Sequence, residues 1–185
     1  MKVLTILEPK FNDIELTTPL SCIKRADENV LIDYFHPEFK KLTGQYNIVT
    51  IDNIKNKVNF DEYDLIFIPG GVGAQNLRTN KESLNLIKNT KTPIAAICDA
   101  PNVLRENNII SEELTYSSYP SEWSIKTWST LRKNEYVTNN FKNNKIITAK
   151  CADAGMDLGL EIVKEFYGEK IYTKVVTAMK GIKEQ

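Results

Sequence analysis

One cysteine, at the end of an apolar segment, is the residue of this chain best placed to do chemistry. Residues 94–97 are Ile-Ala-Ala-Ile, a run typical of a buried parallel strand, and Cys98 follows directly. The next segment, 100–107, has the pattern of one or two helical turns. Backbone N–H groups and the helix dipole favour an anion at such a junction, so a lowered thiol pKa is expected. The sequence predicts a reactive thiolate at Cys98; a small buried core residue is the alternative.

A glycine pair is predicted to lie beside this sulfur. The arrangement around Cys98 copies, with sulfur, the strand–nucleophile–helix turn of α/β hydrolases. The clearest apolar strand, 63–69, is closed by Pro69 and the pair Gly70-Gly71. Because the carboxyl ends of parallel strands share one edge of a sheet, we expect the amides of Gly71 and Asp99 to form an oxyanion hole, with Gly70 in the same pocket. Most Pro-Gly-Gly turns only reverse the chain, which is the alternative.

Glu15 is the carboxylate expected nearest to this edge, at the start of the first predicted helix. An ionised carboxylate would repel a thiolate, whereas a carboxyl group protonated by burial would donate a hydrogen bond to it. A solvated glutamate near a favourable helix N-terminus is the alternative, and the residues alone favour it.

Other residues are weaker candidates. Cys151 ends another strand region and is predicted to face the crevice, as a resolving cysteine or as packing. Cys22 has the helical spacing of a core residue, and Asp153 is predicted to be the N-cap of the helix that follows it. Trp123 and Trp128 are expected to line either the pocket or a dimer surface.

Composition narrows the class of protein. The 185 residues predict a single domain, 1–185, with 24 basic and 24 acidic side chains and no basic stripe. Nucleic acid and membrane surfaces are therefore not expected partners. Three scattered cysteines predict neither a disulfide framework nor a zinc site, and no cofactor or metal is expected. No signal peptide or membrane span stands out, which predicts a cytoplasmic location.

Strand and helix patterns alternate along the chain, which predicts an α/β sandwich with a mostly parallel sheet. Segment 36–45 is expected to be a connection with a short helical turn, and 114–131 does not separate into strand and loop. The expected strands are 2–7, 30–35, 46–51, 63–69, 94–98, 145–149 and 172–177. The expected helices are 14–27, which Pro19 would kink or break, 81–89, 100–107 and 155–167.

Two stretches resemble the ThiJ/PfpI superfamily, also called the DJ-one superfamily: Tyr-Asp-Leu-Ile-Phe-Ile-Pro-Gly-Gly-Val-Gly-Ala-Gln-Asn-Leu at 63–77 and Ala-Ala-Ile-Cys-Asp-Ala-Pro at 95–101. The order of elements fits from residue 2 to about 177, and 73–77 is similar to the DJ-one-like branch. The resemblance implies a flavodoxin-like three-layer sandwich, of the class I glutamine amidotransferase-like type, that is usually dimeric. It implies Cys98 as nucleophile, Glu15 as the carboxyl that contacts it, and Gly71 as an oxyanion-hole amide.

The chain departs from that family at two places. Family glyoxalases and peptidases have a histidine before a proline after the nucleophile, and here segment 115–120 places Tyr119 or a neighbouring serine there. The only histidine, His36, lies far upstream, so a Cys/His pair is not expected. The second departure is Asp99, next to the nucleophile. Its carboxylate would raise the thiol pKa, so we expect it to point to solvent.

Three functions follow from these residues. The first is cysteine-dependent chemistry on a small carbonyl compound, as in a glyoxalase or deglycase, with Glu15 moving protons. The second is an oxidative-stress protein whose Cys98 is oxidised by a small oxidant. The third is a binding scaffold without chemistry. An amidase or peptidase is disfavoured by the missing histidine.

Overall fold

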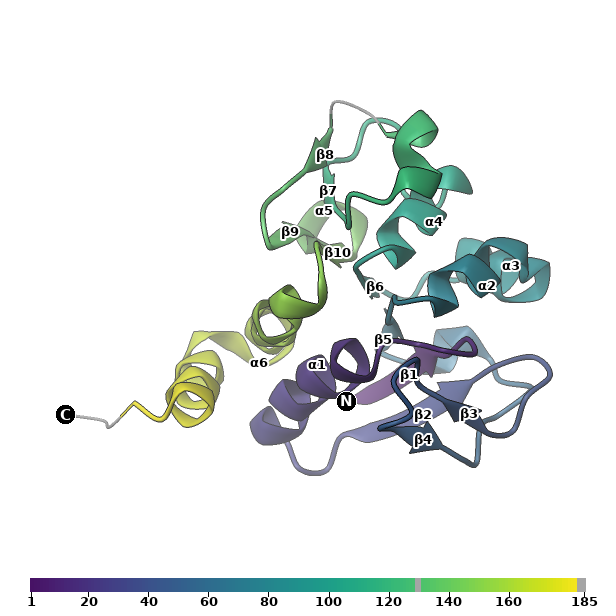
Figure 1. The fold of residues 1–185 in the computed structure, drawn as a ribbon. Helices are drawn as coiled ribbons and strands as arrows, with labels where there is room; N and C mark the ends of the chain where they lie inside the picture. Colours follow the sequence, from purple (N-terminus) through teal and green to yellow (C-terminus); the bar gives the residue numbers. More distant parts are fainter. Residues whose placement is uncertain (129–130, 183–185) are drawn as a thin grey trace.

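The computed structural model describes residues 1–128 and 131–182 and contains a six-stranded central sheet (Figure 1). Five strands are parallel, and the edge strand β9 is antiparallel to β10. In spatial order the strands are β2 (Leu31–Phe35), β1 (Lys2–Ile6), β5 (Leu65–Ile68), β6 (Ile94–Ile97), β10 (Ile146–Ala149) and β9 (Val137–Asn140). This order confirms the mostly parallel sheet expected from the sequence.

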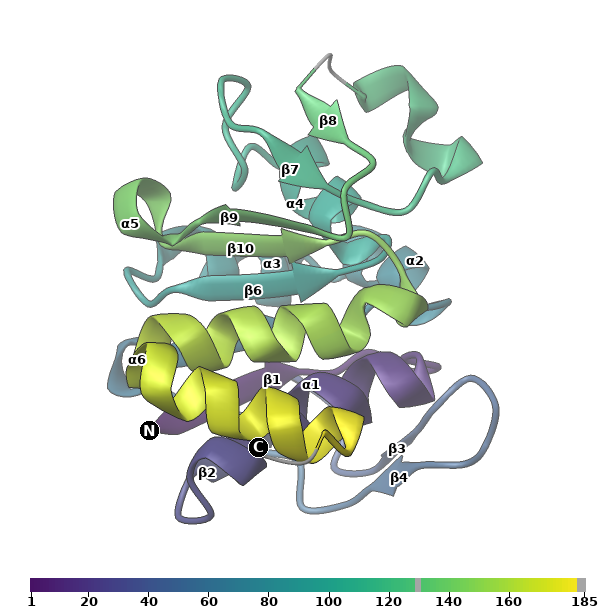
Figure 2. The same cartoon turned by 90° about the vertical axis from the view of Figure 1, so that its left-hand side faces the viewer.

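Helices cover both faces of the sheet, as Figure 2 shows with α1 and α6 in front and α2 and α3 behind. Leu65 and Phe67 pack in a core that includes side chains of α1 and α6, whereas Ile66 and Ile68 pack in a second core with α2, α3 and α4. A strand buried on both faces reads as a continuous apolar run. The helix bounds are α1 Asp13–Ala26, α2 Gly73–Thr79, α3 Lys81–Asn89, α4 Ala100–Glu106 and α6 Gly155–Lys180. The three-layer α/β sandwich is confirmed.

Smaller elements lie around this sandwich. The strands β3 (Leu42–Thr43) and β4 (Thr50–Ile51) pair antiparallel, and β7 (Tyr116–Ser117) pairs parallel with β8 (Arg132–Lys133). The remaining turns of helix are η1 (Phe60–Glu62), η2 (Glu122–Thr127), α5 (Phe141–Asn144) and η3 (Ala152–Ala154). The stretch 114–131 thus contains β7 and η2, and its residues 129–130 lie outside the described part of the chain.

The prediction of a last strand at 172–177 is wrong, because these residues belong to α6. The helix departs from helical geometry at Gly168 (φ 80°, ψ 173°), and the chain turns there so that its last part runs back alongside the first (Figure 2). Ile171, Val175 and Met179 recur at helical spacing, and they pack on the core shared with α1. That spacing is typical of a helix, but the β-branched residues of 171–177 favoured the prediction of a strand.

Three further expectations are corrected, and one strand was not predicted. In 46–51 only Thr50–Ile51 is strand, and it lies outside the main sheet. In 36–45 the structure has the short strand β3 in place of a helical turn. The helix α1 continues through Pro19 without a break. The strand β9 was missed because its sequence, Val-Thr-Asn-Asn, has two residues that are depleted in strands.

Candidate active site

Cys98 lies in a tight turn between β6 and α4, which we call the elbow (residues 97–100). Its φ is +66°, a left-handed conformation that is uncommon outside glycine and is often found at functional turns. The Cys98 amide donates to the carbonyl of Ala149 (2.9 Å), and the Tyr119 amide donates to the Cys98 carbonyl (2.8 Å). Cys98 as a whole residue is 8% exposed. The turn is therefore fixed on both sides, with its sulfur near the surface of the core.

Backbone amides converge on this sulfur. The N–H groups of Gly71 and Asp99 both hydrogen-bond to it, in the arrangement expected of an oxyanion hole. Gly71 has φ +80°, a conformation that glycine adopts without strain. Gly70 is needed for space, since a Cβ there would lie 2.7 Å from the Ile97 carbonyl oxygen and 2.8 Å from the Cys98 Cβ. The two glycines thus let the end of β5 approach the elbow closely.

Glu15 meets the sulfur from the other side. Its amide and that of Ile14 donate to the side-chain oxygen of Asn12, which caps α1. Glu15 as a whole residue is 1% exposed, so the solvated alternative is wrong. Its Oε2 accepts the Gly70 N–H (2.9 Å), and the carboxyl group is hydrogen-bonded to the Cys98 side chain. Burial raises the pKa of Glu15 to about 7, although these two hydrogen bonds oppose the rise.

The expected lowering of the Cys98 pKa is not what this environment produces. Burial and then the negative charge of Glu15 raise the thiol pKa, and the amides of Gly71 and Asp99 oppose that rise. Near neutral pH Glu15 is therefore partly protonated beside a neutral Cys98 thiol. Once Glu15 ionises, the pair shares one proton, which the thiol mainly holds. The amide effect considered in the sequence is present, but it does not outweigh burial and the nearby Glu15 carboxylate.

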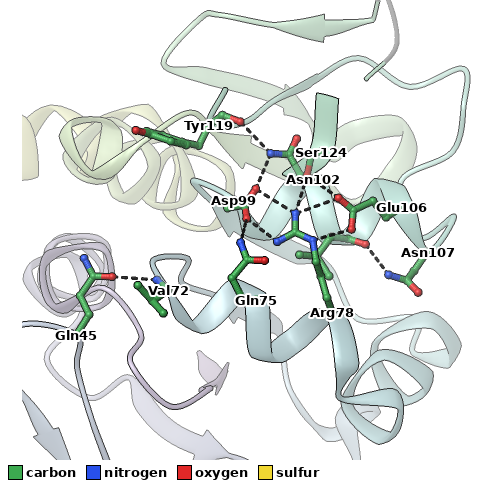
Figure 3. A network of polar contacts seen from close by, with 11 residues as sticks. Gln45, Val72, Gln75, Arg78, Asp99, Asn102, Glu106, Asn107, Tyr119 and Ser124 are labelled. Atoms are coloured by element: carbon green, nitrogen blue, oxygen red, sulfur yellow. Dashed lines mark hydrogen bonds and ion pairs between the residues drawn. The ribbon is translucent and has the colours of Figure 1, made fainter. Parts of the chain in front are cut away.

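Asp99 does not point to solvent as expected. Its side chain is 5% exposed, and its Oδ2 lies 2.6 Å from Nη1 of Arg78 (Figure 3). The carboxylate points toward α2 and α4 while the amide of the same residue faces the sulfur. The Asp99 carboxylate, which was expected to raise the thiol pKa if it lay near the sulfur, is thus paired with a guanidinium group.

A cavity of about 670 Å³ opens at the elbow. The sequence-predicted residues that line it are Cys98, Glu15, Gly71, Asp99, Tyr119 and Cys151. Gly70 does not line the cavity, but it lies directly against Glu15 and Cys98. Trp123 also lines the cavity, whereas Trp128 stacks on the guanidinium of Arg132. The structure therefore brings the predicted residues together, and their roles in a reaction stay predictions.

Sequence reasoning missed one wall of this cavity, the loop that carries Gln45 and Tyr46. The Gln45 Oε1 accepts the Val72 N–H (2.9 Å), as Figure 3 shows. The carboxylate of Asp13 holds the loop by accepting the amides of Tyr46, Ile48 and Val49. No periodicity marks such a loop, because it joins the two-residue strands β3 and β4 and is held by one buried aspartate.

Three other residues singled out in the sequence have structural partners of their own. His36 is buried away from the elbow cavity: its Nδ1 accepts two backbone amides and its Nε2 lies 3.3 Å from Glu8. Cys22 is fully buried in the core, as predicted. Asp153 is not the N-cap of α6, since Ala154 occupies that position and Asp153 accepts the Tyr136 hydroxyl.

Two other features are absent from residues 1–128 and 131–182. No three His, Cys, Asp or Glu side chains in this part of the chain are grouped so that they could bind a metal ion. No helix in it is both long enough and apolar enough to cross a membrane.

Comparison with known proteins decides the family. The model of the DJ-1/PfpI family matches residues 1–165. The chain belongs to this family. Protein MG029 of Mycoplasma genitalium is 31% identical over 179 residues, which cover 95% of this chain and 93% of that protein. The deglycase PH1704 of Pyrococcus horikoshii is 32% identical over 108 residues, which cover 56% of this chain and 64% of that protein.

Solved structures share the fold. The oxidized DJ-1 of Toxoplasma gondii superimposes with a TM-score of 0.81 at 21% identity, covering 96% of this chain and 97% of that one. The protein VC2308 gives a TM-score of 0.82 at 16% identity, covering 96% of this chain and 92% of that one. At such identities the likeness concerns the fold, and the chemistry of the DJ-1/PfpI family member described here has to be argued from its own site.

Proposed function

We propose that this DJ-1/PfpI-family protein converts small carbonyl compounds, such as the 2-oxoaldehyde methylglyoxal, by covalent chemistry at Cys98. The observation that carries the proposal is the buried Cys98–Glu15 pair beneath the amides of Gly71 and Asp99, at the floor of an open cavity. The similarity to proteins named deglycases supports it. The homodimer and the cytoplasmic location expected from the sequence stay predictions.

The first step suits the proton shared by this pair. The sulfur attacks the aldehyde carbon while Glu15 accepts the thiol proton, so no free thiolate is needed and the raised thiol pKa is no obstacle. The amides of Gly71 and Asp99 hold the aldehyde oxygen as it becomes negative. Glu15 then passes the thiol proton to this oxygen, which gives a hemithioacetal and leaves Glu15 ionised again.

The later steps need only proton transfers and water. Glu15 moves the proton of the former aldehyde carbon to the neighbouring carbonyl carbon, through an enediol. The hydroxyl proton passes from the first oxygen to the neighbouring one, which leaves a 2-hydroxy thioester on Cys98. Water then cleaves the thioester to a 2-hydroxy acid and restores the thiol. One carbon is oxidised and its neighbour is reduced, so the reaction balances without an external oxidant.

The cavity also suggests the charge of the substrate. Its lining includes three carboxylates, those of Glu15, Asp99 and Asp153, and among the described residues that line it none is Lys, Arg or His. Only the Asp99 carboxylate is paired with a cation, Arg78. Carboxylates without a counter-charge repel an anion. An uncharged carbonyl compound therefore fits this site better than one that carries a carboxylate.

A second function rests on the protonation of Glu15. Because burial raises its pKa to about 7, a large share of Glu15 is protonated at neutral pH and can donate to an oxidised Cys98. Peroxide would oxidise the Cys98 sulfur to the sulfenic and then the sulfinic acid, with water formed at each step. This reaction needs no histidine.

The deciding experiment is the variant Cys98→Ser, with Cys22→Ser as the matched control. We expect kcat/KM for methylglyoxal to fall by at least about 100-fold in Cys98→Ser and not in Cys22→Ser, since a serine hydroxyl is a far weaker nucleophile than a thiol. Full activity in Cys98→Ser would overturn the carbonyl reaction. The second function would be favoured by two results together. The wild-type protein would show no turnover, and its Cys98 would gain two oxygen atoms in dilute peroxide before Cys22 does.

A further inference from the structure

A buried polar network lies on the far side of the elbow from Glu15, and its centre is Arg78 of α2 (Figure 3). Its guanidinium group is bidentate to Asp99, with Nη1 to Oδ2 at 2.6 Å and Nη2 to Oδ1 at 3.2 Å. It also donates twice to Glu106 of α4, from Nε at 2.8 Å and from Nη2 at 3.0 Å. The three side chains are 16%, 5% and 17% exposed.

We propose that Arg78 is a positioning residue that holds the Asp99 carboxylate away from the Cys98 sulfur while the Asp99 amide is kept directed at it. Asp99 has two groups with opposite effects on the sulfur, since its N–H stabilises a negative sulfur and its carboxylate would repel one. The inference concerns the site of the proposed function, but it predicts the reactivity of the thiol and does not depend on the substrate.

The geometry explains why an arginine is needed. Two carboxylates, Asp99 and Glu106, are buried together, and one planar guanidinium group pairs with both at once through its fork of N–H donors. A lysine would supply a single point of charge and could not fix the plane of the Asp99 carboxylate. Gln75 completes the arrangement by donating to Oδ2 of Asp99 (3.1 Å), so the carboxylate is held from α2 at two points.

The same network fixes the walls around the elbow. Asn102 donates both to Oδ1 of Asp99 and to the carbonyl of Tyr119, each at 2.8 Å, and the Tyr119 amide in turn donates to the Cys98 carbonyl. Ser124 of η2 accepts from Nη2 of Arg78 (2.6 Å) and donates to Glu106 (2.5 Å). Ser124 follows Trp123, which lines the cavity. Arg78 therefore links the elbow to both segments that cover it.

The test compares the alkylation of Cys98 by iodoacetamide across pH 6 to 10 in wild type, Arg78→Met and Arg78→Met/Asp99→Asn. Arg78→Met leaves the Asp99 charge without its partner, so the Cys98 pKa should rise by about one unit. The rate below the midpoint should then fall about fourfold, because a more basic thiolate is also more nucleophilic. The double variant removes the stray charge and should return the rate to within about twofold of wild type.

Controls separate this role from a loss of structure. Arg105→Met removes another arginine, one of α4 that pairs with Glu112, and should leave the Cys98 profile unchanged. Cys22, fully buried, should remain unlabelled in every folded variant. Where Arg78→Met exposes Cys22, Arg78→Lys is measured in its place and should slow Cys98 at least about twofold.

Two results would overturn the proposal: an unchanged Cys98 profile in a folded Arg78 variant, or a slowed variant that Asp99→Asn fails to restore. Both are read from the thiol alone, so they remain decisive even if the protein turns over no carbonyl compound. Conversely, a restored profile in a protein without turnover would support the role of Arg78 and count only against the proposed function.

Discussion

Two carboxylates flank the elbow, and the protein treats them in opposite ways. Glu15 on the α1 side is buried with hydrogen bonds from Gly70 and Cys98 but without a cation, and burial raises its pKa to about 7. Asp99 on the α2 side is equally buried and is paired with the guanidinium of Arg78. The difference teaches that burial without a counter-charge brings the pKa of an acid close to neutral pH, whereas a buried acid beside an arginine is held in an ion pair.

The sharpest way to break this comparison is Glu15→Gln, which keeps the shape of the side chain and removes its ability to accept the thiol proton. We expect kcat/KM for methylglyoxal to fall by about 10²- to 10⁴-fold, the usual contribution of a general base. In wild type the same parameter should rise with pH toward about 7, as Glu15 ionises. A variant that keeps wild-type activity would show that Glu15 carries no proton in the reaction.

Stability should respond in opposite directions on the two sides. The pKa of Glu15 is raised from 4.5 to about 7, so the folded state binds its proton more tightly and loses that advantage as pH rises through this window. Relative to wild type, Glu15→Gln should therefore gain stability between pH 4.5 and 7, by up to roughly 3 kcal/mol. Asp99→Asn should instead cost about 1–3 kcal/mol, because Arg78 loses a charged partner.

Chemical denaturation of both variants at pH 5 and pH 8 measures this contrast. Equal changes of the same sign in the two variants would contradict it, as would a Glu15→Gln gain that is larger at pH 5 than at pH 8.

The smallest effect is expected away from the elbow, at His36→Gln. His36 lines a separate cavity of about 500 Å³ and has both ring nitrogens occupied by Glu8 and backbone amides. We expect a loss of about 1–2 kcal/mol of stability from these bonds and less than about twofold change in kcat/KM. Stopped-flow kinetics and thermal unfolding measure the two quantities, and a large kinetic effect would mean that the two cavities are coupled.

How far the sequence predicts this molecule depends on the range of the interactions involved. The strand ending at Cys98, the glycine pair and the helix that starts before Glu15 all follow from local pattern, and the rule that parallel strands end at one edge brings them together. The partner of Asp99 does not follow, because it depends on which face of α2 presents Arg78 to the elbow. Likewise the pKa of Cys98 depends on burial beside Glu15, which no motif encodes.

The segment wrongly predicted as a strand, 172–177, and the strand that was missed, β9, have the same kind of cause. Residues 171–179 form a helix because they pack on the core that α1 shares, and β9 is a strand because β10 offers it an open edge. In each segment a neighbour distant in the sequence overrides the local preference.

The left-handed backbone of Cys98 has an evolutionary consequence. A residue with a Cβ at φ +66° gives up about 1 kcal/mol that glycine would not. Selection for a stable fold alone would favour replacing this cysteine, since the substitution would relieve strain and also remove an oxidisable sulfur. Under the proposed function, the turn is thus a position where durability and reactivity make opposite demands on one side chain.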